Sequence, residues 1–192
     1  AEVQPSTLVR FSQALGYQGF SEMQEVFRAR LRDRVLNYDE RIAQLRARAA
    51  ASSKPNAVFH GFSDAAEQSI ASLRERLDPR QLDRAVDMLS RAQTLYLVGL
   101  RRSFPIASYM AYAFGKLGVR AILIDAVGGM AAEQMSFATP KDTVLAVSFT
   151  PYASETVALA QSVAARQVPL VSITDSPFSP LAQIADLWIE VV

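Results

Sequence analysis

Five short apolar runs alternate with helical patterns through the second half of this chain. The runs are Thr94–Val98, Ala121–Asp125, Thr143–Phe149, Leu170–Thr174 and Leu187–Val191. Helical patterns between them begin near Phe104, Gly129, Ser154 and Ser179. Near-continuous apolar strands separated by helices are typical of a parallel sheet that is covered on both faces. We therefore expect an α/β fold: a three-layer αβα sandwich around a five-stranded parallel sheet.

The first half has a helical period instead. Val3–Leu15 predicts a helix with Pro5 near its first position and Gly16 as its stop. Ser21 and Gln24 match a capping box that opens a long helix reaching about Ala51.

The stretch Ala49–Asn56 is small and polar and contains a proline, so it indicates a linker. Two further helices follow, Ser63–Leu77 and Asp78–Ala92, with Asp78 and Pro79 as N-cap and first position of the second. These patterns divide the chain into a helical segment (1–51), a linker (52–62) and the α/β domain (63–192).

Two segments, 94–107 and 142–157, share one plan: an apolar strand, a hydroxyl-rich loop and then a helix. Helix N-termini carry unpaired N–H groups and the positive end of the dipole, so such junctions bind anions, above all phosphates. Serine and threonine hydroxyls can hydrogen-bond a phosphate without burying a full charge, and an arginine can clamp it in a bidentate pair. Gly99 would let the chain turn sharply off its strand. The candidate ligand-binding residues here are Gly99, Arg102, Ser103, Ser148, Thr150, Ser154 and Thr156.

Both loop serines have a second interpretation. Ser103 and Ser154 each precede a predicted helix, and capping is the commoner role of such a serine. Capping and anion binding use the same helix end, so the two roles are compatible.

The motifs that the chain lacks restrict its chemistry. Neither GxGxxG nor GxxxxGK[ST] occurs, which argues against a dinucleotide site and a P-loop. The chain has no cysteine, which excludes disulfides and thiolate metal ligands. We expect no cofactor and no metal.

Acid–base catalysis has few candidates. The single histidine, His60, lies in or beside the linker. Glu133 and Glu155 are conceivable bases, but Glu155 falls in the first turn of a helix, where a carboxylate stabilises the dipole. Glu133 follows two glycines and is a further candidate ligand contact. We expect a binding protein rather than an enzyme.

Charge and composition add two points. Half of the residues are hydrophobic, and no membrane span or signal peptide is evident, which favours a cytoplasmic protein. Residues 1–120 hold 18 basic and 12 acidic residues, whereas residues 121–192 hold 2 and 7. This asymmetry indicates that the first part meets an anionic partner, or that it presents an arginine-rich solvated helix face.

Three motifs carry a family resemblance. VGLRRS, AVSFTPYASET and SITDSPFSPLAQIADLWIEV occur in that order and resemble a SIS (sugar isomerase) phosphosugar-binding domain. The stretch PSTLVRFSQALGYQGFSEMQEVF resembles the end of the helix-turn-helix domain of RpiR-type transcriptional regulators. The resemblance implies a flavodoxin-like strand order, with Ser103 as first-loop phosphate ligand and Ser148, Thr150 and Thr156 as second-loop hydroxyls. Many such domains have SxSGxT where this chain has SFTPYASET, and the change implies that Tyr152 shapes the sugar end.

The family resemblance also implies a function. It implies a transcription factor that senses a phosphorylated sugar or sugar acid and thereby changes its affinity for a double-stranded DNA operator. Val3–Leu15 would be the recognition helix, with Ser6, Thr7 and Arg10 facing the DNA. We expect a homodimer or dimer of dimers, and further helices before and after the present chain. The alternatives are a phosphosugar isomerase or a SIS module that only mediates assembly.

Overall fold

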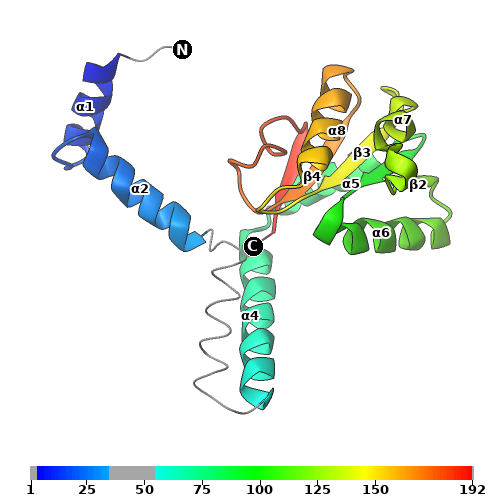
Figure 1. Cartoon of the computed structure of the whole chain (residues 1–192), viewed down its shortest axis with the longest axis horizontal. Helices are drawn as coiled ribbons and strands as arrows, with labels where there is room; N and C mark the ends of the chain where they lie inside the picture. Colours follow the sequence, from blue (N-terminus) through cyan, green and yellow to red (C-terminus); the bar gives the residue numbers. More distant parts are fainter. Residues whose placement is uncertain (1–3, 35–54, 192) are drawn as a thin grey trace. The chain divides into compact units, whose positions relative to one another are not determined.

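The computed structural model describes residues 4–34 and 55–191. The chain divides into two compact units, Ala1–Ser53 and Lys54–Val192 (Figure 1).

The first unit contains two described helices, α1 (Pro5–Ala14) and α2 (Phe20–Arg34). As predicted, α1 has its proline at the start, and it is followed by Gly16 with φ +90°, a left-handed conformation that suits glycine. The capping box is wrong, because Ser21 lies inside α2. The Gln18 N–H instead donates to the Glu22 carboxylate at 2.6 Å. The predicted continuation to Ala51 lies outside the described residues from position 35 onward.

Two helices open the second unit: α4 (Pro55–Arg76) and α5 (Pro79–Ser90). The helix predicted from Ser63 begins eight residues earlier, so residues 55–62 are helical rather than a linker. Pro55 stands at the first helical position, where its missing N–H costs no hydrogen bond, so this proline marks a helix start. Asp78 is the N-cap of α5, as predicted, and accepts the Arg80 N–H at 2.9 Å.

All five predicted strands form one parallel sheet in the order β2-β1-β3-β4-β5, which confirms the flavodoxin-like topology. The strands are β1 (Leu95–Val98), β2 (Ala121–Ile124), β3 (Thr143–Val147), β4 (Leu170–Thr174) and β5 (Leu187–Glu190). Strand β1 pairs with both β2 and β3, so Leu97 stands level with Leu123 and Leu145.

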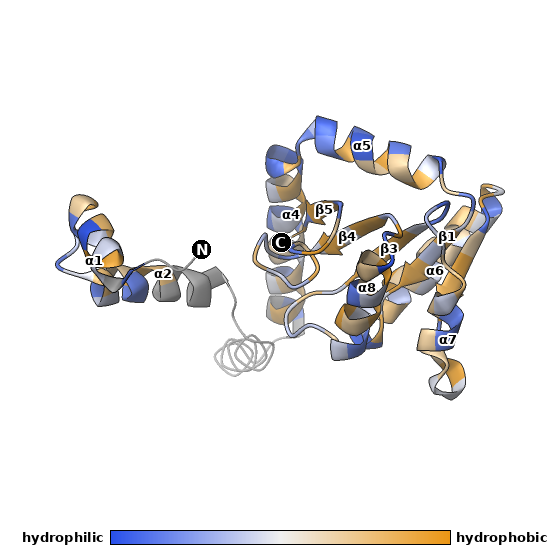
Figure 2. Cartoon of the chain, turned by 90° about the horizontal axis from the view of Figure 1, so that it is seen from above, coloured by the Kyte–Doolittle hydropathy of each residue, from blue (hydrophilic) through white to orange (hydrophobic). Residues whose placement is uncertain are grey.

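Helices cover both faces of the sheet, as expected of a three-layer sandwich (Figure 1). Helices α5 and α6 (Phe104–Lys116) pack on one face, against alternate strand residues such as Leu97 and Val171. Helices α7 (Ala131–Ser136) and α8 (Ser154–Ala165) pack on the other, against Val98 and Val144. The strands are strongly apolar in Figure 2 because most of their residues are buried from both sides.

Two sequence expectations about helices need correction. The helix expected near Gly129 begins at Ala131, because Gly128 and Gly129 have φ values of +65° and +77°. No helix forms near Ser179. That segment makes consecutive turns, in which Gln183 N–H donates to Ser179 and Ala185 N–H donates to Leu181. The Ser179 hydroxyl accepts the Ala182 N–H at 3.0 Å, as at a helix start, but β5 begins at Leu187 and leaves space only for these turns.

Candidate functional site

The carboxyl ends of β1 and β3 lie side by side at the point where the chain switches faces of the sheet. Strand β1 leads into α6 on one face, and β3 leads into α8 on the other. In open parallel sheets this is the crevice where ligands bind. We call the two loops and helix starts there, residues 99–104 and 148–156, the anion site.

Gly99 opens the first loop, and it is required for space. A Cβ atom at this position would lie 3.0 Å from the Ser103 carbonyl oxygen and 3.2 Å from the Ala107 Cβ. Gly99 does not have a left-handed φ, so the sharp turn that we expected from the sequence is not the reason for a glycine at this position. The missing side chain lets the short 3₁₀ turn η1 (Arg101–Ser103) and the start of α6 approach Gly99 closely.

Ser103 lies at the end of that turn with only 2% of its surface exposed. It is the N-cap residue of α6, as predicted, but its hydroxyl makes no capping hydrogen bond. Unlike the Ser172 hydroxyl, it is not among the fully buried side-chain atoms that lack a partner in the described residues. The Ser103 hydroxyl is therefore a group that a ligand oxygen could satisfy.

One buried hydroxyl ties the second loop to the first, and another holds the second loop itself. Thr156 is fully buried, and its hydroxyl accepts the Leu100 N–H at 3.2 Å. Ser148 is also buried, and its hydroxyl accepts the Ala153 N–H at 3.2 Å. Each of these hydroxyls keeps its own proton for a further hydrogen bond. The structure thus joins Thr156 to the first loop, and it places Ser103 and Ser148 in the loops that follow the neighbouring strands β1 and β3.

Ser154 does not have its expected capping role. The N-cap of α8 is Ala153, and Ser154 is the first helical residue. Its exposed hydroxyl lies 3.1 Å from the Glu155 carboxylate. The observed N-cap, Ala153, is therefore one residue before the predicted one.

Two arginines of the first loop reach across to the second. Arg102 donates to the carbonyl oxygens of Phe149, at 2.7 Å, and Thr150. It therefore holds the opposite loop in this structure, whereas the sequence pointed to a clamp on phosphate. Arg101, with φ +56°, forms a 2.7 Å ion pair with Glu155. The hydrogen bond from Arg101 lowers the pKa of Glu155 to about 2.

Sequence reasoning missed one residue of this region, Asp175. It directly follows β4, and its carboxylate accepts the Thr150 N–H and the Tyr152 hydroxyl, each at 2.9 Å. Burial and this carboxylate raise the pKa of the Tyr152 hydroxyl. Its position in the sequence could have predicted this. Asp175 directly follows an apolar strand, and the ends of parallel strands lie at the same edge of the sheet as the other two loops.

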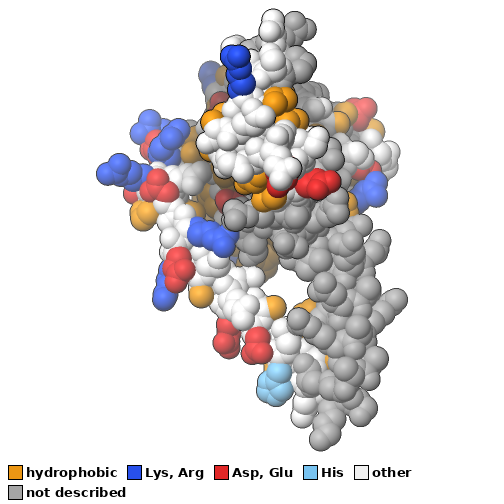
Figure 3. Space-filling model, turned by 90° about the vertical axis from the view of Figure 1, so that its left-hand side faces the viewer, with side chains coloured by type: hydrophobic (Ala, Val, Ile, Leu, Met, Phe, Trp, Pro, Cys, Tyr) orange, Lys and Arg blue, Asp and Glu red, His pale blue; other side chains and the backbone are white. Residues whose placement is uncertain are grey.

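The remaining predicted residues are exposed. Glu133 lies on α7, and no hydrogen bond joins its side chain to either loop within the described part of the chain, so its contact with ligand stays a prediction. Ser6, Thr7 and Arg10 lie exposed on α1, as a DNA-reading face requires. The one histidine, His60, is exposed on α4 (pale blue in Figure 3).

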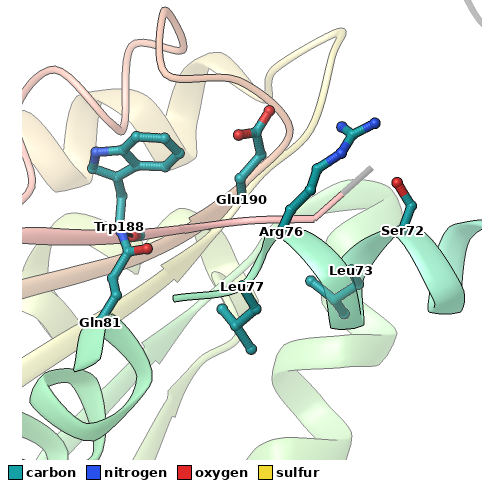
Figure 4. Close-up of a pocket in the computed structure, with 7 residues that line it drawn as sticks. All are labelled: Ser72, Leu73, Arg76, Leu77, Gln81, Trp188 and Glu190. Atoms are coloured by element: carbon teal, nitrogen blue, oxygen red, sulfur yellow. Dashed lines mark hydrogen bonds between the residues drawn. The ribbon is translucent and has the colours of Figure 1, made fainter. Parts of the chain in front are cut away.

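A separate cavity of about 100 Å³ lies at the edge strand β5 (Figure 4). The Gln81 amide donates to the Trp188 carbonyl oxygen beside it. Its lining comes from α4, the α4–α5 turn, α5 and β5: Ser72, Leu73, Arg76, Leu77, Gln81, Trp188 and Glu190.

Within residues 4–34 and 55–191, no cluster of three or more histidine, aspartate or glutamate side chains could hold a metal ion. None of the helices in these ranges is both long enough and apolar enough to span a bilayer.

Comparison with known proteins identifies the domain. The SIS domain family matches residues 88–192. An uncharacterized HTH-type transcriptional regulator of Haemophilus influenzae is 26% identical over 96% of this chain and 63% of its own length. The HTH-type transcriptional regulator HexR of Pseudomonas aeruginosa is 24% identical over 100% of this chain and 64% of its own length. The present chain thus spans slightly less than two thirds of these relatives.

Solved structures agree with that result. The sugar isomerase domain of an RpiR transcription factor from Sphaerobacter thermophilus superposes with a TM-score of 0.61 and 28% identity, over 66% of this chain and 72% of that one. NanR of Vibrio vulnificus, solved with ManNAc-6P, superposes with a TM-score of 0.66 and 20% identity, over 99% of this chain and 64% of that one. These matches confirm the resemblance to RpiR-type regulators that carry a SIS domain.

Proposed function

Because this chain belongs to the SIS domain family, we propose that its anion site binds the phosphate group of a phosphorylated sugar or sugar acid. We further propose that the whole protein is a transcriptional regulator whose affinity for its DNA operator changes when this effector binds.

The observation that carries the proposal is that the loops after two adjacent strands, β1 and β3, both carry hydroxyl residues with little exposed surface and are joined by the Leu100–Thr156 hydrogen bond. Ser103, Ser148 and Thr156 come from both loops, and each is at most 2% exposed. Hydroxyls and backbone N–H groups at helix N-termini bind a phosphate dianion through charge-assisted hydrogen bonds. The rim carries Arg102, whose charge is bonded only to carbonyl oxygens and favours the approach of an anion, whereas Arg101 is paired with Glu155.

The chemistry of the site supports binding without turnover. Isomerisation of a sugar phosphate needs a base whose pKa lies near the working pH. Glu155 is the carboxylate nearest in sequence to the site hydroxyls, and its pKa of about 2 makes it a weak base. Curated relatives over nearly the whole chain are also named as transcriptional regulators.

The first unit supports the DNA-binding half of the proposal. Helix α1 presents Ser6, Thr7 and Arg10 on its exposed side, where a recognition helix would read the major groove. Arg10 would contact a guanine or a phosphate. Regulators that read two half-sites do so as pairs, and we propose a homodimer or dimer of dimers acting on the nucleoid in the cytoplasm.

Calorimetric titration tests effector binding. The chain is titrated with inorganic phosphate and with ManNAc-6P, beside an isomerase assay on ManNAc-6P. We expect binding without turnover. A Ser103→Ala/Ser148→Ala double variant should lose at least about 100-fold in affinity, since each hydroxyl bond to a charged group contributes about 1.5–3 kcal/mol. Ser90→Ala, at an exposed serine of α5, is the matched control. Unchanged affinity in the double variant, or turnover, contradicts the proposal.

A full-length protein carrying Arg10→Ala tests DNA binding. We expect weaker operator binding and a change of about one in the slope of log affinity against log salt concentration. If neither moves, α1 is not the recognition helix.

A further inference from the structure

We propose that Asp175 is the positioning residue of the anion site, which holds the phosphate-binding loop after β3 in its binding conformation. This inference rests on the proposed function. It goes beyond it by assigning a role to a carboxylate that neither the family match nor the sequence motifs place at the ligand.

The Asp175 carboxylate accepts hydrogen bonds from two donors in the loop that follows β3. Asp175 Oδ2 accepts the Thr150 N–H at 2.9 Å, and Oδ1 accepts the Tyr152 hydroxyl at 2.9 Å. The two donors flank Pro151, so the carboxylate holds both sides of the loop's apex. All three hydrogen-bonding residues are half-buried, which excludes much of the competing water.

The same loop is held from the opposite side by Arg102, which donates to the Phe149 and Thr150 carbonyl oxygens. The Thr150 N–H is therefore held by Asp175 at the end of β4, and its carbonyl oxygen is held by Arg102 after β1. Between these anchors the chain passes from Ser148 into the first turn of α8, where Thr156 lies. Hydroxyls bind a phosphate well only when they are held in place before it arrives.

Electrostatics makes the role testable through the sign of an effect. A carboxylate close to a bound phosphate repels it, so removal of the Asp175 charge alone should tighten phosphate binding about two- to threefold. Loss of the two hydrogen bonds that hold the loop should instead weaken phosphate binding. An asparagine has one acceptor oxygen and cannot accept both donors in this arrangement. Asp175→Asn therefore removes the repulsion and the anchor together, and weaker binding is the direction that an anchoring role requires.

Asp186 provides a matched control. Its carboxylate accepts the Leu170 N–H at 2.8 Å, at the amino end of the same strand. Asp186→Asn makes the same change of charge and also loosens a backbone N–H bond, but at the opposite edge of the sheet. A general loss of stability would appear in both variants.

The experiment follows the backbone amides of the whole chain by NMR while inorganic phosphate is added, and measures hydrogen exchange in its absence. We expect Asp175→Asn to weaken phosphate binding about tenfold and to speed exchange of the Thr150 amide at least tenfold. Asp186→Asn should leave both unchanged. Tyr152→Phe keeps the Asp175 charge and removes one of its two donors, so it should weaken phosphate binding about threefold. If Asp175→Asn does not fold, this variant tests the role of Asp175 in its place.

Equal or tighter binding by Asp175→Asn, with the wild type binding phosphate, overturns the role of Asp175 and leaves the proposed function standing. Equal losses in Asp175→Asn and Asp186→Asn also overturn it. If the wild type binds no phosphate, the proposed function and this inference both fail.

Discussion

The hydrogen bond between the Leu100 N–H and the Thr156 hydroxyl connects the two halves of the anion site, and Thr156→Val tests its contribution. Both residues are buried, with exposed fractions of 8% and 0%. Valine preserves the shape of threonine and removes the acceptor, so the Leu100 N–H would remain buried without a partner. A buried donor left in that state costs about 1–3 kcal/mol. At about 3 °C for each kcal/mol in a unit of this size, Tm should fall by about 3–9 °C.

Urea unfolding followed by the fluorescence of Trp188, the chain's single tryptophan, gives the free energy directly because this residue lies in β5 of the same unit. Thr156→Ser is the control. It keeps the acceptor oxygen and removes one methyl group, a loss of about 0.8 kcal/mol. We expect valine to cost more than serine. Stability equal to the wild type in Thr156→Val, or a larger loss in Thr156→Ser, refutes the argument that this bond joins the two loops.

Three more predictions concern neighbouring residues. Gly99→Ala should lower the free energy of unfolding by about 1–3 kcal/mol and weaken phosphate binding, because the new Cβ would lie 3.0 Å from the Ser103 carbonyl oxygen; an unchanged melting curve would show that the loop has room. The Glu155 carboxyl should titrate near pH 2 by ¹³C NMR, and in Arg101→Gln the pKa should return toward its usual range. Since the pKa is lowered in the folded state, the stabilising effect of this pair is present above the usual carboxyl pKa and is lost as pH falls toward 2. Ser172→Ala should stabilise the protein by about 1 kcal/mol, because the buried Ser172 hydroxyl has no hydrogen-bond partner among the described residues; a clear loss of stability in urea unfolding would reveal one.

Local patterns were sufficient to place most elements of the second unit. Leu170–Thr174 was predicted residue for residue, because an apolar run of that length between turn signals has few alternatives to a buried strand. The start of α5 followed from Asp78 and Pro79, whose capping chemistry acts within one helical turn. The helix predicted near Ser179 was wrong because the sequence pattern does not show how soon the chain must enter β5, which begins at Leu187.

The sequence by itself determined the fold class and the types of residue that follow each strand. Alternating strands and helices require a parallel sheet, and parallel strands bring the hydroxyls after β1 and β3 to one edge. The tertiary structure alone decided which groups are already engaged. Arg102 lies 47 residues from the Phe149 carbonyl that it holds, and Asp175 lies 25 residues from Thr150. Such pairings depend on the strand order and on the exact length of each loop, and no periodicity along the chain encodes either one.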